Sequence, residues 1–164
     1  MLFIIDANVL IDYANTDPSI LSLAIKHIGP IFVASVILDE VEQLSVEDCV
    51  NLGLRIIEEP VEILIAAGER RGRLSFEDHI CLLLAVDNEY ICISNDKPLH
   101  SACREENVSV MWGLRLMIEL VRKGVLDKSS AMEVAEAIHL SNPFHITSEI
   151  IAEFKNKLYF SHRA

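Results

Sequence analysis

The sequence has few basic residues. Its 164 residues include 14 Lys and Arg against 25 Asp and Glu, so the formal net charge is −11. This balance argues against a protein that holds nucleic acid through a broad basic surface. It remains compatible with an enzyme that contacts phosphate through a bound metal ion. The acidity belongs to one part of the chain, because residues 1–113 carry a net charge of −12 and residues 114–164 a net charge of +1.

Long apolar runs and paired cysteine motifs are also missing. The longest apolar stretches, such as Ile80–Val86, are far shorter than the roughly 20 residues that a membrane span needs. Met1–Asp6 contains no basic residue and reaches a charge at Asp6, so we expect no signal peptide. Cysteines occur at positions 49, 81, 92 and 103, without a C-x-x-C pair. We therefore expect reduced core cysteines in a cytoplasmic protein.

Short apolar runs alternate with helical patterns along the chain. Predicted strands cover Leu2–Ile5, Ile31–Ala34, Leu54–Ile57, Tyr90–Ser94 and Val108–Met111. Predicted helices include one capped by Asn8, one over Val36–Leu44, two that begin with capping boxes at Ser45 and Ser75, and one opened by Asp96. Strands alternating with helices predict an α/β fold with a mostly parallel sheet covered on both faces. Two further helices, over Ser130–His139 and Ser148–Leu158, predict a C-terminal helical hairpin.

Four acidic residues share one predicted place in this fold. Asp6 and Asp96 follow strands, Asp78 begins a helix, and Glu40 lies more than one turn into its predicted helix. The carboxyl ends of parallel strands and the starts of the following helices meet at one edge of such a sheet. Carboxylates gathered there repel one another unless a cation neutralises them, and oxygen ligands suit Mg²⁺ or Mn²⁺. Simple helix capping is the alternative for each Asp taken alone, but Glu40 is too deep in its helix to be a cap.

Four segments resemble the motifs of PIN-domain nucleases, in the order in which that family has them. They are Phe3–Ile11, Ala34–Val41, Leu74–Asp78 followed by Leu82–Ala85, and Ile93–Leu99. The match covers about residues 1–125 and places Asp6, Glu40, Asp78 and Asp96 at the acidic positions of the family. Arg122–Leu126 and the two helices after it resemble a subgroup of PIN proteins, and many relatives are toxins of the VapC type.

The resemblance implies a three-layer α/β/α nuclease domain over residues 1–127. Residues 128–164 would form a helical extension packed on the same domain or on a partner. The implied activity is metal-dependent cleavage of a phosphodiester, most often in RNA, by an activated water that leaves a 5′-phosphate. Mg²⁺ or Mn²⁺ would be held by Asp6, Asp78 and Asp96, and Glu40 would join the ligands or orient the water. Asn8, Ser94 and Asn95 would support these ligands, and Asp39 and Glu77 are alternatives to their acidic neighbours. A homodimer and an antitoxin partner are further expectations.

Basic and aromatic residues near these motifs have two readings each. Arg70, Arg71 and Arg73 would contact substrate phosphate or an antitoxin, or would form a solvated loop. Lys97, beside Asp96, would contact phosphate or form a surface pair. We expect Trp112 to pack against the core rather than to stack on a base.

Two other classes of protein stay open. A PIN-like fold without catalysis would act as a binding module, although all four acidic positions are filled here. Another α/β protein that handles phosphoryl groups is the remaining alternative. A dehalogenase-like phosphatase would have Asp two residues beyond its nucleophile, where this chain has Asn8. A receiver-type phosphoacceptor would have an acidic pair near the end of the first strand, which is absent here.

Overall fold

A five-stranded parallel sheet forms the centre of the molecule. The computed structural model describes residues 1–160. The strands are β1 (Phe3–Ile5), β2 (Ile31–Ala34), β3 (Arg55–Ile57), β4 (Ile91–Ile93) and β5 (Val110–Met111), and their spatial order is β3-β2-β1-β4-β5. All four strand pairs are parallel. The predicted α/β fold with a mostly parallel sheet is confirmed.

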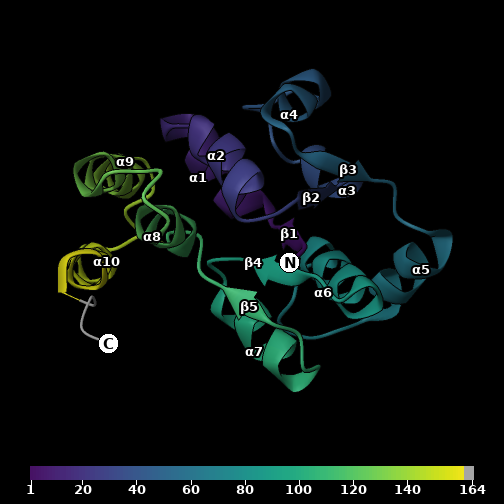
Figure 1. Ribbon diagram of the computed structural model, residues 1–164. Coiled ribbons are helices and arrows are strands. Elements are labelled where there is room, and N and C mark those ends of the chain that lie inside the picture. Colours follow the sequence, from purple (N-terminus) through teal and green to yellow (C-terminus); the bar gives the residue numbers. More distant parts are fainter. Residues whose placement is uncertain (161–164) are drawn as a thin grey trace.

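Helices cover both faces of this sheet. The helices α1 (Ala7–Thr16), α2 (Ser19–His27) and α8 (Arg115–Arg122) lie on one side, and α6 (Phe76–Asn88) and α7 (Lys97–Glu105) lie on the other (Figure 1). Three more helices, α3 (Ser35–Leu38), α4 (Val46–Leu52) and α5 (Val61–Glu69), belong to the connections around β3. The central strands are fully apolar because both of their faces are buried, as Ile4, Ile5 and Ile93 illustrate with no exposed surface.

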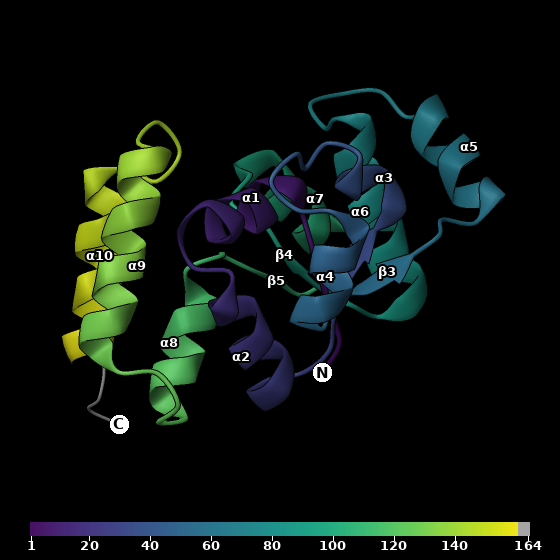
Figure 2. The ribbon, with the colours of Figure 1, turned by 90° about the horizontal axis from the view of Figure 1, so that it is seen from above.

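The C-terminal region forms the predicted pair of helices. Helix α9 spans Lys128–Ser141 and α10 spans Ser148–Phe160, and Figure 2 shows them side by side at one edge of the molecule. Helix α9 packs on α1 and α8, and α10 packs on α8 and α9. Ile138 and Phe154 are among the side chains buried in these contacts. Residues 161–164 of the predicted extension lie outside the described residues.

Two local predictions are wrong. The helix expected over Val36–Leu44 ends at Leu38, and Glu40 lies in a turn in which its N–H bonds the Ile37 carbonyl at 3.1 Å. Val41 is buried without helical structure, so the apolar spacing that suggested a longer helix is explained by burial in a non-helical segment. The argument that Glu40 lies too deep in a helix to be a cap therefore fails.

The cap of α1 is the second correction. Asp6 caps this helix, because its Oδ1 accepts a hydrogen bond from the N–H of Val9 at 3.0 Å. Asn8, the predicted cap, lies inside the first turn. The capping boxes predicted at Ser45 and Ser75 are both present, at the starts of α4 and α6.

The cysteines and the apolar character of the helices can be compared with the expectations from the sequence. All four cysteines are buried and unpaired among the described residues. A search of the helices within residues 1–160 finds none with the length and apolar character for a membrane crossing.

Candidate active site

The strand order places Asp6 and Asp96 beside each other. The chain runs outward from β1 through β2 to β3, then crosses to β4 on the other side of β1. In open parallel sheets, the crevice at the carboxyl ends of the strands at such a reversal is the usual place for a ligand. Asp6 directly follows β1 and donates its backbone N–H to the Ile93 carbonyl of β4 at 3.1 Å, while Asp96 lies three residues beyond β4.

A cavity of about 260 Å³ opens at this edge, and we call it the carboxylate cavity. Its lining residues are Asp6, Ala7, Asn8, Ile37, Glu40, Ser75, Glu77, Asp78 and Asp96. The fold thus brings together all four acidic residues singled out in the sequence, from four separate segments of the chain. Glu77, the alternative to Asp78, lines the same cavity, whereas Asp39 does not belong to the lining.

Asp6 is held by a short network of hydrogen bonds at the base of the cavity. Its side chain is only 4% exposed. Its Oδ1 accepts from the Val9 N–H, and its Oδ2 accepts from the hydroxyl of Ser94. The same Ser94 oxygen accepts the backbone N–H of Asp96 at 3.0 Å. Ser94 therefore connects the two aspartates that end the neighbouring strands, as a supporting residue would.

Asp78 and Asp96 are each held at the start of a helix. The Oδ2 of Asp78 accepts from the Ser75 N–H at 3.2 Å, within the capping box of α6. The Oδ2 of Asp96 accepts from the Leu99 N–H at 3.0 Å, which caps α7. Both side chains cap a helix and also face the cavity, so the capping interpretation and the site interpretation describe the same residues.

Burial and repulsion between neighbouring carboxylates raise the pKa values of Asp6, Glu40 and Asp78. The pKa of Asp6 rises to about 7, mainly by burial and further by the charges of Asp78 and Asp96, against the opposing hydrogen bonds from Ser94 and Val9. The pKa of Asp78 is raised mainly by burial. The pKa of Glu40 is raised by partial desolvation and by Glu77 beside it. A cation in the cavity would relieve this repulsion.

The donor atoms suit a hard divalent cation, but the side chains do not converge on one point. Within residues 1–160, no three Asp, Glu, His or Cys side chains are grouped closely enough to hold a metal ion. The hydrogen bonds described above direct one oxygen each of Asp78 and Asp96 to backbone N–H groups. Mg²⁺ and Mn²⁺ accept such a site because they bind through one or two carboxylates and keep several waters. The oxygen donors, the raised pKa values and the cavity fit this kind of ion.

Several predicted residues lie outside this cavity. The side chain of Asn95 accepts from the Gly113 N–H at 3.0 Å and donates to Asp12 at 3.4 Å, so it supports the neighbouring connection instead of the acidic residues. Arg70, Arg71 and Arg73 are exposed, and none of them lines the cavity. The Arg71 guanidinium donates to the carbonyls of Gly68, at the end of α5, and of Arg70, as in the solvated-loop interpretation.

Asp12 is a buried residue that the sequence reasoning missed. It is 4% exposed, and its Oδ1 accepts from the Asn142 side chain at 3.0 Å. Burial raises its pKa. Its signal in the sequence is a charge on the apolar face of α1, next to Tyr13, where an unpaired charge is costly. Through Asn95 and Asn142, Asp12 links the connection that carries Asp96 to the α9–α10 connection.

Glu59 is a second residue that only the structure identifies. Its carboxylate accepts from the Ser35 hydroxyl at 2.7 Å and from the Val36 N–H at 2.8 Å. These bonds hold the start of α3, the short helix that leads to Glu40. The residue lies 23 positions along the chain from Val36, so local sequence patterns carry no signal for this contact.

Comparison with known proteins supports the fold. No protein-family model and no curated protein matches this sequence. Among solved structures, it is similar to a PilT N-terminus (PIN) domain protein from the hyperthermophilic archaeon Sulfolobus solfataricus P2. The TM-score is 0.50 and the sequence identity 12%, and the match covers 73% of this chain and 92% of that chain. This similarity, together with the parallel sheet and its helical layers, shows that the chain has a PIN-like fold.

Proposed function

We propose that this protein is a metal-dependent phosphodiesterase that cleaves RNA. The observation that carries the proposal is the carboxylate cavity: four acidic residues from four segments line one cavity where the strand order reverses. The raised pKa values of Asp6, Asp78 and Glu40 support it, because burial disfavours their ionised forms and a bound cation would favour them. RNA as the substrate rests on the resemblance of the four motifs to PIN-domain nucleases.

In this proposal, Asp6, Asp78 and Asp96 hold Mg²⁺ or Mn²⁺. The bound ion would supply Lewis-acid stabilisation of the phosphate and a water of lowered pKa. Glu40, in its turn at the cavity rim, joins the ligands or orients the attacking water. Ser94 keeps Asp6 and Asp96 in register through its two hydrogen bonds, and Asn8 lies at the cavity wall. A toxin role and an antitoxin partner are finer parts of the same proposal, tested by growth arrest on expression and by mapping cleavage in total cellular RNA.

The chain offers a matched pair of variants for the test. Asp78 and Asp48 both complete a capping box at a helix start, with the same pattern of hydrogen bonds to Ser75 and Ser45. Asp78 lines the carboxylate cavity, while Asp48 is exposed on α4. We expect Asp48→Asn to cost about 1 kcal/mol of stability, and Asp78→Asn to cost no more, because burial raises the pKa of Asp78. Only Asp78→Asn should lower Mn²⁺-dependent cleavage of single-stranded RNA. Loss of a residue that merely supports a metal ligand lowers activity by roughly 100-fold at most, so loss of a ligand should lower it by more than that.

Asp6→Asn and Asp96→Asn should abolish cleavage in the same assay without unfolding the protein. Calorimetric titration with Mn²⁺ gives a second measurement, because Asp6→Asn should also lose the metal binding of the native chain. A native chain that binds Mn²⁺ but cuts no RNA would favour the binding-module alternative. Equal cleavage by the native, Asp78→Asn and Asp96→Asn proteins would show that the assigned site is wrong.

A further inference from the structure

A larger groove of about 940 Å³ begins next to the carboxylate cavity. We call it the α8–α10 groove, because α8, α10 and the connection between α9 and α10 supply much of its lining, together with the start of α7. Asp96 lines both the groove and the carboxylate cavity. The two spaces therefore meet at one of the proposed metal ligands.

The groove concentrates positive charge in an acidic protein. Four cationic side chains line it: Lys97, Arg115, Arg122 and Lys157. The carboxylates in its lining are Asp96, Glu149 and Glu153, so the cations are in slight excess, whereas the whole chain carries −11. Such a local concentration of cations in an acidic protein favours a polyanionic ligand at this place.

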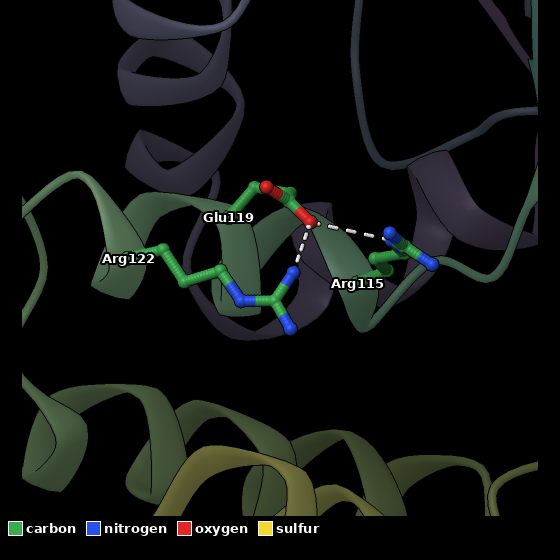
Figure 3. Close-up of polar contacts among 3 residues, drawn as sticks. All are labelled: Arg115, Glu119 and Arg122. Carbon is green, nitrogen blue, oxygen red and sulfur yellow. Dashed lines mark hydrogen bonds and ion pairs between the residues drawn. The ribbon is translucent and has the colours of Figure 1, made fainter. Parts of the chain in front are cut away.

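The ion pairs of these cations are exposed. Glu119 contacts Arg115 at 3.3 Å and Arg122 at 2.9 Å, so one carboxylate serves two guanidinium groups on the same face of α8 (Figure 3). Lys157 pairs with Glu153 at 2.9 Å, with about half of each side chain or more in solvent. Exposed pairs of this kind are weak, so a phosphate can replace them at little cost.

Aromatic side chains lie among these cations. Trp112 stacks on His100 with 3.6 Å between the ring centres, which is the expected packing role, and 39% of its surface stays exposed. Phe144, in the α9–α10 connection, is 93% exposed. Both line the groove. The bond between Asn142 and Asp12 anchors the connection that carries Phe144.

We infer that the α8–α10 groove binds single-stranded RNA and leads its backbone to the carboxylate cavity. The inference rests on the proposed function, and it identifies the path by which the RNA substrate reaches the carboxylate cavity. Exposed aromatic faces between cations are the usual means of holding single strands, because unstacked bases stack on the rings while the cations contact phosphates. A duplex keeps its bases stacked and would leave Trp112 and Phe144 without a role.

The test measures RNA binding without catalysis. The probe is a fluorescein-labelled oligouridine of twelve nucleotides, followed by fluorescence anisotropy in EDTA at 50 mM salt. Lys157→Glu is compared with Lys155→Glu, since both lysines lie on α10 and are exposed, but only Lys157 lines the groove. We expect Lys157→Glu to weaken binding about tenfold and Lys155→Glu less than about threefold, with the salt dependence reduced only by Lys157→Glu.

A second pair of variants tests stacking. Trp112→Ala should weaken oligouridine binding about tenfold, and Trp112→Phe, which keeps an aromatic face, should restore most of the affinity. Circular dichroism of both variants establishes that they are folded. Equal loss of affinity in both variants would contradict base stacking on the ring at position 112.

The outcomes separate this inference from the proposed function. Groove variants that lose oligouridine binding, in a native chain that does not cleave RNA with Mn²⁺, would support the groove and overturn the nuclease proposal. Lysine variants that weaken binding equally, together with an unaffected Trp112→Ala, would overturn the groove as the RNA path even if the native chain cleaves RNA. In that case the groove belongs to another occupant, such as a protein partner.

Discussion

The carboxylate cavity and the α8–α10 groove share Asp96 but differ in charge and in origin. The cavity is small and lined by carboxylates at strand ends and helix starts, whereas the groove is more than three times larger and has a slight excess of cations. The cavity comes from the sheet domain, and much of the groove comes from α8 and the C-terminal helices. A net charge of −11 therefore conceals a strongly acidic cavity beside a groove in which cations and carboxylates nearly balance. This separation suits a nuclease in which the scissile phosphate meets the metal ion in the cavity while the groove binds the rest of the RNA.

Asp6→Asn should show the largest effect on stability, and it tests the cost of an ionised carboxylate at the buried base of the cavity. The pKa of Asp6 is about 7 in the folded protein and near 3.8 when unfolded, so the folded state binds more protons between these values. The free energy of unfolding of the metal-free protein should therefore fall as the pH rises from about 4 to 7. At 1.36 kcal/mol per pKa unit, the fall is on the order of 4 kcal/mol at most. Urea unfolding in EDTA at several pH values measures it.

The asparagine variant cannot ionise at this position and should lack most of that fall. It should therefore be more stable than the native protein at pH 8, but not at pH 4. Asp39→Asn, at an exposed position outside the cavity, is the control and should keep the native pH dependence. If native protein and Asp6→Asn lose stability in parallel as the pH rises, the titrating group is not Asp6.

Asp12→Asn should have an intermediate effect, because Asp12 links the two regions. The variant replaces one acceptor oxygen by an amide that faces the amide of Asn142 or Asn95. A buried polar group left without its partner costs about 1–3 kcal/mol, which urea unfolding would detect. Oligouridine binding should weaken as well, since Asn142 anchors the connection that carries Phe144. Asp87→Asn, exposed on α6, should change neither measurement. Loss of stability with unchanged binding would separate Asp12 from the groove.

Glu119→Gln should have the smallest effect, and it tests whether the charge of the groove controls RNA binding. The exposed pairs with Arg115 and Arg122 contribute little, so stability should change by less than about 1 kcal/mol. Release of both guanidinium groups should strengthen oligouridine binding about twofold at low salt. Glu133→Gln, exposed on α9, removes the same charge outside the groove. Weaker binding by Glu119→Gln would show that Glu119 positions the arginines for the ligand.

Local patterns predicted much of the fold. The strand over Ile31–Ala34 was predicted at its observed bounds, because a short apolar, β-branched run between turns is typical of a buried strand. The capping boxes at Ser45 and Ser75 were predicted because their hydrogen bonds join residues three positions apart. The helix expected over Val36–Leu44 was wrong, since apolar residues such as Val41 are buried there without helical structure.

The candidate site divides in the same way. The positions of Asp6, Asp78 and Asp96 after strands or at helix starts could be read from the sequence, and parallel strands place such positions at one edge. Asp12, Glu59 and the pairing of Asn95 with Gly113 could not, because their partners are distant in the chain. The basic loop at Arg70–Arg73 attracted attention by its density, while the cations of the groove are scattered between Lys97 and Lys157.

The sequence by itself determined the alternation of strands and helices, the capping boxes and the gathering of acidic residues at one sheet edge. These features depend on contacts between near neighbours and on the direction that all parallel strands share. Only the tertiary structure decided that Ser94 joins Asp6 to Asp96, that Asp12 connects α1 to the C-terminal helices, and that scattered cations and aromatic rings line one groove. Those contacts depend on how α8, α9 and α10 pack against the sheet and its other helices, and this packing is set by apolar surfaces that no short stretch of sequence contains.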